Sequence, residues 1–113
     1  TSASSRLIHF TGPYKLLNGA TVANNWADLT DGSIITAINR DEFSNLASGV
    51  ALWTNTLNTG FVYSPNYSCD RWVGGSSSWR GGSGNSGLTD SGWTLNYNRF
   101  RCDSMLHLYC FEQ

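Results

Sequence analysis

All three cysteines of this 113-residue chain lie in its C-terminal part, at positions 69, 102 and 110. This pattern predicts a disulfide that pins a long irregular stretch against a sheet. Zinc is the alternative, because Cys69, Cys102, His107 and Cys110 are all zinc-ligand types. However, His107 and Cys110 would point to opposite faces of one strand and could not converge on a metal without a bulge. We therefore predict a disulfide and no metal site.

The odd cysteine count leaves one cysteine over. In a secreted chain it is a buried free thiol, a bridge to another chain, or the partner of a cysteine in a segment outside this sequence. At this point all three interpretations stay open.

Composition favours a single recognition domain spanning residues 1–113. The net charge of −1 gives no electrostatic reason to bind nucleic acid or an anionic membrane. Neutral polar residues with five Trp and five Tyr are typical of extracellular domains, so we expect a secreted or cell-surface location. No apolar run approaches the roughly 20 residues needed to span a bilayer. The start shows no signal peptide, which we expect to lie upstream of Thr1 or to have been removed.

Short apolar runs mark the elements of the first half. Residues 6–10 form a strand candidate. Asn18 and Gly19 separate two apolar runs and predict a β-hairpin with a type I′ turn. Trp26 and Leu29 are three residues apart and predict one buried helical turn.

The middle of the chain continues the predicted core. Residues 34–38 are apolar enough to be partly buried, and we expect Phe43 and Leu46 to anchor the segment that follows them. Residues 50–53 form a short apolar run, which predicts a buried strand.

The last part of the chain predicts a long loop and a final strand. Residues 74–87 are mostly Gly and Ser, interrupted by Trp79 and Arg80, and a structureless stretch of this length is usually functional or disordered. Residues 93–95 predict a short strand. Residues 105–112 are apolar at both alternating sets of positions, which predicts a central strand covered on both faces.

Specific residues in this pattern resemble the second half of a C-type-lectin-like domain: Trp53, Cys69-x2-Trp72, Trp93 and Cys102-x7-Cys110. With the terminal Leu-Tyr-Cys-Phe-Glu-Gln and residues 25–32, the chain more closely resembles the endostatin-like branch and a bacterial family of secreted domains of uncharacterised function. The similarity covers most of the chain from Leu16 onward. It implies an α+β, C-type-lectin-like fold, rich in strands and loops, with a long irregular loop region. The N-terminal helix of that fold is lacking here, which implies the C-terminal portion of a longer protein.

The resemblance also implies two nested disulfides. The inner one would join Cys69 to Cys102, and the outer one would join Cys110 to a cysteine on the absent helix. The calcium-site motifs Glu-Pro-Asn, Gln-Pro-Asp and Trp-Asn-Asp do not occur, and residues 97–101 stand before Cys102 instead. Calcium-bridged sugar binding is therefore not expected. The seven scattered Lys and Arg residues do not reproduce the heparin surface of endostatin.

Other motifs favour neither a cofactor nor catalysis. Asp28, Asp31, Asp41 and Glu42 are the densest carboxylates; calcium is one interpretation, but Asx turns and a helix cap are the simpler one. Residues 82–87 match the dinucleotide fingerprint without its flanking strand and helix, so we predict a loop and no cofactor. Ser is abundant and two His are present, yet no nucleophile elbow occurs, and we predict no enzyme.

Aromatic and amide residues around the predicted loop are the ligand-binding candidates. Trp79 and Arg80 suit stacking on a sugar or anchoring a protein partner, with Tyr63, Tyr67 and Asn85 as secondary candidates. The alternative is that Trp79 folds back onto the core. The remaining tryptophans are assigned to the core: Trp26, Trp53, Trp72 and Trp93.

These observations predict an extracellular recognition or adhesion module. Its partner would be a glycan or a cell-envelope component, held by aromatic side chains on a disulfide-fixed loop. The alternative is a protein–protein or oligomerising tip domain of a bacterial surface or fibre protein. Neither nucleic acid nor membrane insertion is expected.

Overall fold

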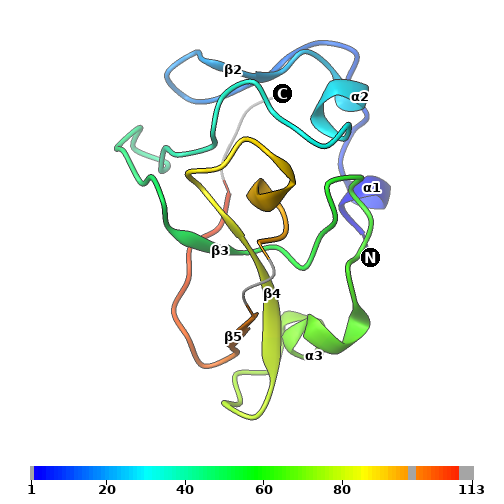
Figure 1. Ribbon diagram of the computed structural model, residues 1–113, viewed down its shortest axis with the longest axis vertical. Helices are drawn as coiled ribbons and strands as arrows, with labels where there is room; N and C mark the ends of the chain where they lie inside the picture. The colour runs from blue at the N-terminus through cyan, green and yellow to red at the C-terminus, as the bar shows by residue number, and fades with distance from the viewer. Residues whose placement is uncertain (1, 97–98, 110–113) are drawn as a thin grey trace.

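Two small antiparallel sheets form the framework of this α+β domain (Figure 1). The computed structural model describes residues 2–96 and 99–109. One sheet pairs β1 (Tyr14–Lys15) with β2 (Thr21–Ala23). The other has the order β3-β4-β5, with β3 spanning Ala51–Trp53, β4 spanning Arg80–Asn85 and β5 spanning Arg99–Arg101. β4 is thus the central strand, pairing through one half with β3 and through the other with β5.

The helices are single turns. They are α1 (Ala3–Arg6), α2 (Trp26–Leu29), η1 (Pro65–Tyr67), α3 (Cys69–Trp72) and η2 (Ser91–Trp93). Within the described ranges, no helix has the length and apolarity to cross a bilayer. α2 confirms the predicted turn: Asn25 caps it by accepting a hydrogen bond from the Asp28 amide, and Leu29 is buried.

The predicted hairpin is present, but its turn type is different. The Gly19 amide donates to the carbonyl of Leu16, and the Leu16 amide donates to the carbonyl of Ala20. Gly19 has a φ of +86°, whereas Asn18 keeps a negative φ. The connection is therefore a type I turn followed by a glycine bulge, which needs only one left-handed residue.

The main core lies between the first sheet, α2 and η2. Its buried side chains are Tyr14, Leu16, Val22, Ala23, Leu29, Ile34, Ile38 and Trp93. Ile34 and Ile38 thus confirm partial burial of residues 34–38. The expectation for Phe43 and Leu46 was wrong: they are 77% and 65% exposed, because Asp41 ties residues 41–45 into a tight surface turn.

The largest correction concerns residues 74–87, where the prediction of one long loop was wrong. Residues 80–85 form β4, the centre of the larger sheet. A Cβ on Gly81 would be 2.4 Å from the Trp53 ring, and one on Gly84 would be 2.0 Å from the Trp93 carbonyl oxygen. These glycines therefore permit close packing on both sides of a strand and do not indicate flexibility.

Two predicted strands, at residues 6–10 and 93–95, were also wrong. Ser2 caps α1, which includes Arg6, by accepting from the Ser5 amide. Asp90 similarly starts η2 by accepting from the Gly92 amide at 2.8 Å. Both caps stabilise helical turns, which include Arg6 and Trp93. Residues 7–10 follow α1 without forming a strand, and the Phe10 amide donates to the Ile8 carbonyl at 2.9 Å.

The prediction of a covered central strand at residues 105–112 fails for its described part. His107 makes an isolated parallel bridge to Leu52. Met105 and Leu108 are 98% and 74% exposed, so the apolar positions on both faces are not covered. Residues 110–112, and with them the predictions about Cys110, lie outside the described residues.

Sequence patterns did not reveal the backbone of α3. All four residues, Cys69, Asp70, Arg71 and Trp72, have positive φ values of 49–68°. The turn is closed by hydrogen bonds from the Trp72 amide to the Ser68 carbonyl and from the Gly74 amide to the Cys69 carbonyl. Left-handed conformations cost L-residues roughly 1–2 kcal/mol each.

A substitution at Asp70 tests this backbone. Asp70 is exposed and has a φ of 53°. We expect Asp70→Gly to raise the free energy of unfolding by about 0.5–1 kcal/mol. Glycine relieves the left-handed strain at this position, and this gain exceeds the stability lost because glycine increases the conformational entropy of the unfolded chain. Asp70→Ala is the matched control, since alanine retains the strain. Urea denaturation of both variants measures the difference, and a less stable glycine variant would contradict the left-handed turn.

Candidate functional site

The five predicted ligand-binding residues are not gathered at one place. Tyr63 stands two residues before η1 and Tyr67 is the last residue of η1; their rings lie together, and Arg80 begins β4. Asn85 ends β4, about 16 Å further along the strand at roughly 3.3 Å per residue. Its side chain accepts a hydrogen bond from the Gly87 amide at 2.8 Å. Tyr63, Tyr67 and Arg80 therefore form the nucleus of the candidate site, and Asn85 is separate from it.

Two tyrosines and an arginine form the best-ordered part of this site. The rings of Tyr63 and Tyr67 stack at a centroid distance of 5.9 Å and an angle of 13°. The Arg99 guanidinium carbon lies 4.3 Å from the Tyr67 ring centroid, and its Nη2 donates to the Tyr63 hydroxyl at 2.6 Å. The hydrogen bond to Tyr63 raises the pKa of Arg99, so this fixed guanidinium stays positively charged.

Two further arginines share the same face of the sheet. Arg80 on β4 is the direct partner of Arg101 on β5, and Gly82 is the partner of Arg99. Since alternate residues of a strand share a face, the three arginine side chains lie on one side of β4 and β5. We call Tyr63, Tyr67, Arg80, Arg99 and Arg101 the basic aromatic face.

The charges on this face are poorly balanced. Arg101 forms a salt bridge with Asp103 at 3.3 Å, but both side chains are well exposed, so the pair contributes little. Arg80 has no salt-bridge partner among the described residues. Like charges placed directly opposite each other destabilise a sheet. The Arg80–Arg101 pair therefore has a small cost in the free protein, which an anionic group placed between the two guanidinium groups would remove.

The disulfide confirms the Cys69–Cys102 pairing that the family resemblance implied, and it fixes the end of the sheet. Cys69 follows η1, which carries Tyr67, and Cys102 follows β5, which carries Arg99 and Arg101. The bond therefore joins the two segments that supply the basic aromatic face. A disulfide is also consistent with an oxidising extracellular environment.

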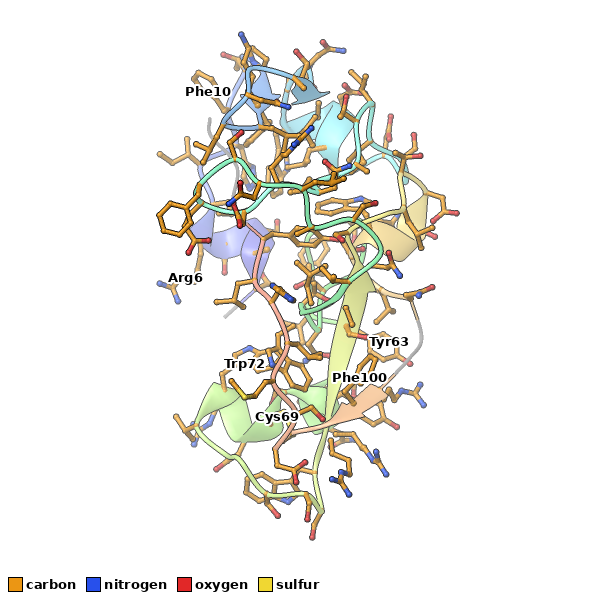
Figure 2. The ribbon with its side chains drawn as sticks, turned by 90° about the vertical axis from the view of Figure 1, so that its left-hand side faces the viewer. Arg6, Phe10, Tyr63, Cys69, Trp72 and Phe100 are labelled. Atoms are coloured by element: carbon orange, nitrogen blue, oxygen red, sulfur yellow. A yellow bond between two sulfur atoms is a disulfide. The ribbon has the colours of Figure 1, made fainter. Side chains whose placement is uncertain are left out.

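Trp79 lies with the disulfide rather than with the basic aromatic face. Its ring is 44% exposed and packs on Gly74, where a Cβ would be 2.0 Å from Cζ3. Gly74, Trp53, Trp72 and the disulfide line a cavity of about 440 Å³. Figure 2 shows Tyr63 and Trp72 on opposite sides of β4.

Assigning Trp72 to the core was wrong, since it is 47% exposed in the left-handed turn. Trp93 is buried as predicted, and Trp26 and Trp53 are partly buried.

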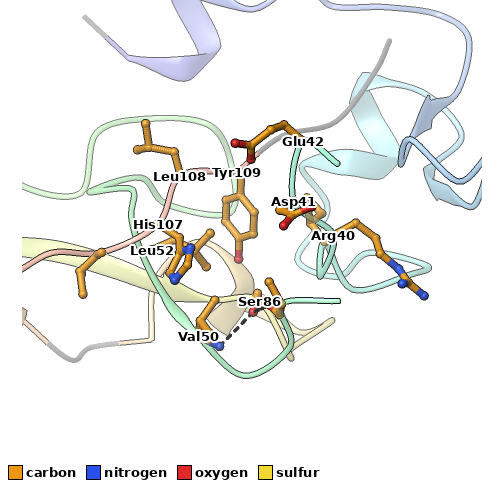
Figure 3. A pocket seen from close by; sticks show the side chains of 12 residues that line it. Arg40, Asp41, Glu42, Val50, Leu52, Ser86, His107, Leu108 and Tyr109 are labelled. Atoms are coloured by element: carbon orange, nitrogen blue, oxygen red, sulfur yellow. Dashed lines mark hydrogen bonds between the residues drawn. The ribbon is translucent and has the colours of Figure 1, made fainter. Parts of the chain in front are cut away.

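A second cavity, of about 360 Å³, is lined by side chains of types that enzymes use in catalysis (Figure 3). Ser86 is buried there, where its hydroxyl donates to the Ala47 carbonyl and accepts from the Val50 amide. Burial raises the pKa of Tyr109, whose hydroxyl donates to the Trp93 carbonyl. Both hydroxyl protons are thus committed to backbone carbonyls, and neither group is arranged as a nucleophile.

Three of the four predicted carboxylates, Asp28, Asp31 and Asp41, serve local structure. Asp28 accepts hydrogen bonds from Asn24, and Asp31 accepts one from the Ser33 amide. Asp41 accepts from the amides of Asn45 and Phe43, and the Asn45 bond is the main cause of its lowered pKa. Within residues 2–96 and 99–109, no three His, Cys, Asp or Glu side chains are placed to hold a metal ion. These contacts match the interpretation of turns and a cap.

Sequence reasoning missed Arg99 and Arg101. The signal was the alternation Arg99, Phe100, Arg101, which is typical of an edge strand with one polar face.

No protein-family model, no curated protein and no solved structure gives a significant match to this chain. The resemblance to C-type-lectin-like domains therefore stays a prediction, and the function must be argued from the site.

Proposed function

We propose that the domain is an extracellular recognition module with a C-type-lectin-like architecture, which binds a glycan or cell-envelope component through the basic aromatic face. The observation that carries the proposal is the fixed Arg99 guanidinium on Tyr67, beside the opposed Arg80 and Arg101. Flat rings suit stacking on sugars, and guanidinium groups form paired hydrogen bonds with carboxylate, sulfate or phosphate. The preferred ligand is therefore an acidic glycan or a similarly acidic envelope polymer.

The disulfide and the sheet support this role by reducing the ordering cost of binding. Arg99 is already held by two tyrosine rings, and the strands that carry the arginines are tied together through Cys69 and Cys102. A rigid, partly preassembled surface loses less conformational entropy when a ligand binds.

A panel of glycans and envelope fragments, with calcium and with chelator, tests the proposal. We expect oligogalacturonate to bind more tightly than a neutral galactan of equal length, with affinity falling as salt rises. Arg80→Gln together with Arg101→Gln should weaken binding about tenfold or more. The unliganded variant should be as stable as the wild type or slightly more stable, because a like-charge pair is removed.

Two controls complete this experiment. Arg71→Gln removes an exposed arginine outside the face and should leave affinity unchanged. Trp79→Ala tests the earlier candidate on the disulfide side. If Trp79→Ala abolishes binding while the Arg80–Arg101 double variant binds normally, the basic aromatic face is not the site.

A protein–protein or oligomerising role is the second candidate, and exposed apolar side chains favour it. Trp72, Val73 and Leu108 are 47%, 79% and 74% exposed, and Trp72 and Leu108 line the cavity beside the disulfide. Light scattering over a concentration series distinguishes the two functions. An oligomer that Leu108→Asn dissociates would support assembly through this surface.

A further inference from the structure

A largely apolar cavity lies away from the basic aromatic face. It has a volume of about 640 Å³ and is lined by α1, α2, residues 53–60, η2 and residues 108–109. Its walls include Trp26, Trp53, Trp93 and Tyr109. Cavities of this size, with mostly apolar walls and a few polar groups, are typical of small-molecule sites.

The cavity is on the opposite side of the larger sheet from the arginines of that face. Trp53 lies in its wall, and the Trp53 ring packs against Gly81. Gly81 faces away from the side that carries Arg80 and Gly82, because consecutive residues of a strand alternate. A ligand here would therefore be independent of the proposed glycan site.

The shape favours a chain-like occupant. This cavity shares Trp53, Thr54 and Leu108 with the cavity beside the disulfide. The two cavities therefore adjoin, and together they form a longer apolar space. A flexible alkyl chain fits such an extended space better than a compact ring does.

The polar groups that line the cavity limit the kind of polar head group that a bound ligand can carry. The hydroxyls of Thr30, Thr54 and Thr56 donate to the backbone carbonyls of Trp26, Thr94 and Thr54 respectively. These threonines thus present mainly methyl groups. Among the residues that the structure describes, Arg6 is the one charged residue that lines the cavity, and no carboxylate does. Figure 2 shows its side chain extending from α1 into solvent, from where it can fold over an anionic group at the mouth.

We propose that this cavity binds the alkyl chain of a single-chain carboxylate amphiphile, with its head group at Arg6. Calorimetry with decanoate, decanol and decyltrimethylammonium, each below its micelle concentration, tests this. We expect saturable binding at one site, tightest for decanoate and weakest for decyltrimethylammonium. Arg6→Gln should weaken decanoate binding about three- to fivefold, as expected for an exposed charge pair, and leave decanol binding unchanged.

A cavity-filling variant keeps the test independent of Arg6. Ala3 is half-buried and lines the mouth, so Ala3→Phe should weaken both decanoate and decanol. Ala27→Phe, at an exposed position of α2 outside the cavity, is the matched control and should bind like the wild type. Absence of saturable decanoate binding, equal binding by the two phenylalanine variants, or tighter binding of the cationic amphiphile would overturn the proposal.

Discussion

Gly84→Ala is expected to destabilise the domain by about 3 kcal/mol or more, a large share of the stability of a small domain. A Cβ at this position would be 2.0 Å from the Trp93 carbonyl oxygen and 2.8 Å from the Trp93 carbonyl carbon. Both are backbone atoms, so no side-chain rotation relieves the clash. Gly84 also pairs with Leu52 at the centre of the larger sheet, which limits movement of β4.

Gly75→Ala is the matched control for this prediction. Gly75 is exposed, and a Cβ there would have no neighbour within 4 Å. Its stability should stay within about 0.5 kcal/mol of the wild type. Urea denaturation followed by tryptophan fluorescence measures both variants. If Gly84→Ala were as stable as Gly75→Ala, the close packing of Gly84 on the Trp93 backbone would be contradicted.

Removing the disulfide should have the second large effect. Cys69 and Cys102 are 33 residues apart, and a bridge closing a loop of this length stabilises by roughly 3–4 kcal/mol through the unfolded chain. We expect the Cys69→Ala, Cys102→Ala double variant to lose about this much. Both the double variant and its parent should carry Cys110→Ala, so that Cys110 cannot form an alternative disulfide.

Reductant provides the control for the disulfide. It should lower the unfolding midpoint of the Cys110→Ala parent and leave the double variant unchanged. Peptide mapping of the unreduced wild type provides the direct check. A bridge between Cys110 and either of the other cysteines would contradict the Cys69–Cys102 pairing.

The elements that the sequence predicted correctly are those with strong local signals. The Trp26–Leu29 spacing predicted α2, and the apolar run at residues 50–53 predicted β3. The hairpin at Gly19 was predicted as well, but its turn type was not. One glycine bulge and a two-residue type I′ turn leave similar sequence signatures, since both place glycine after asparagine.

β4 could not be predicted from local sequence, because packing against other segments of the chain determines which residues fit in it. Gly81 and Gly84 have little strand propensity, and glycine in sequence is most often a turn signal. The Trp53 ring leaves no room for a side chain at Gly81, and the Trp93 backbone leaves none at Gly84. Tertiary packing therefore determined this strand against its local preference.

Only part of the candidate site could be predicted from the sequence, because tertiary pairing brings the rest of it together. Tyr63 and Tyr67 were recognised as aromatic candidates, and their spacing across one turn brings the rings together. Arg99 and Arg101 join them only because β5 pairs with β4. The alternation at residues 99–101 indicates a strand with one polar face, but neither it nor the balanced net charge predicts that Arg101 pairs with Arg80.

The most direct test of the proposed site is an NMR titration of the ¹⁵N-labelled domain with oligogalacturonate. Our account predicts that the largest shifts fall on the guanidinium Nε–Hε signals of Arg80, Arg99 and Arg101 and on the amides of β4 and β5. Shifts confined to Trp72 and Trp79, with the three arginine signals unmoved, would contradict it and place recognition on the disulfide side.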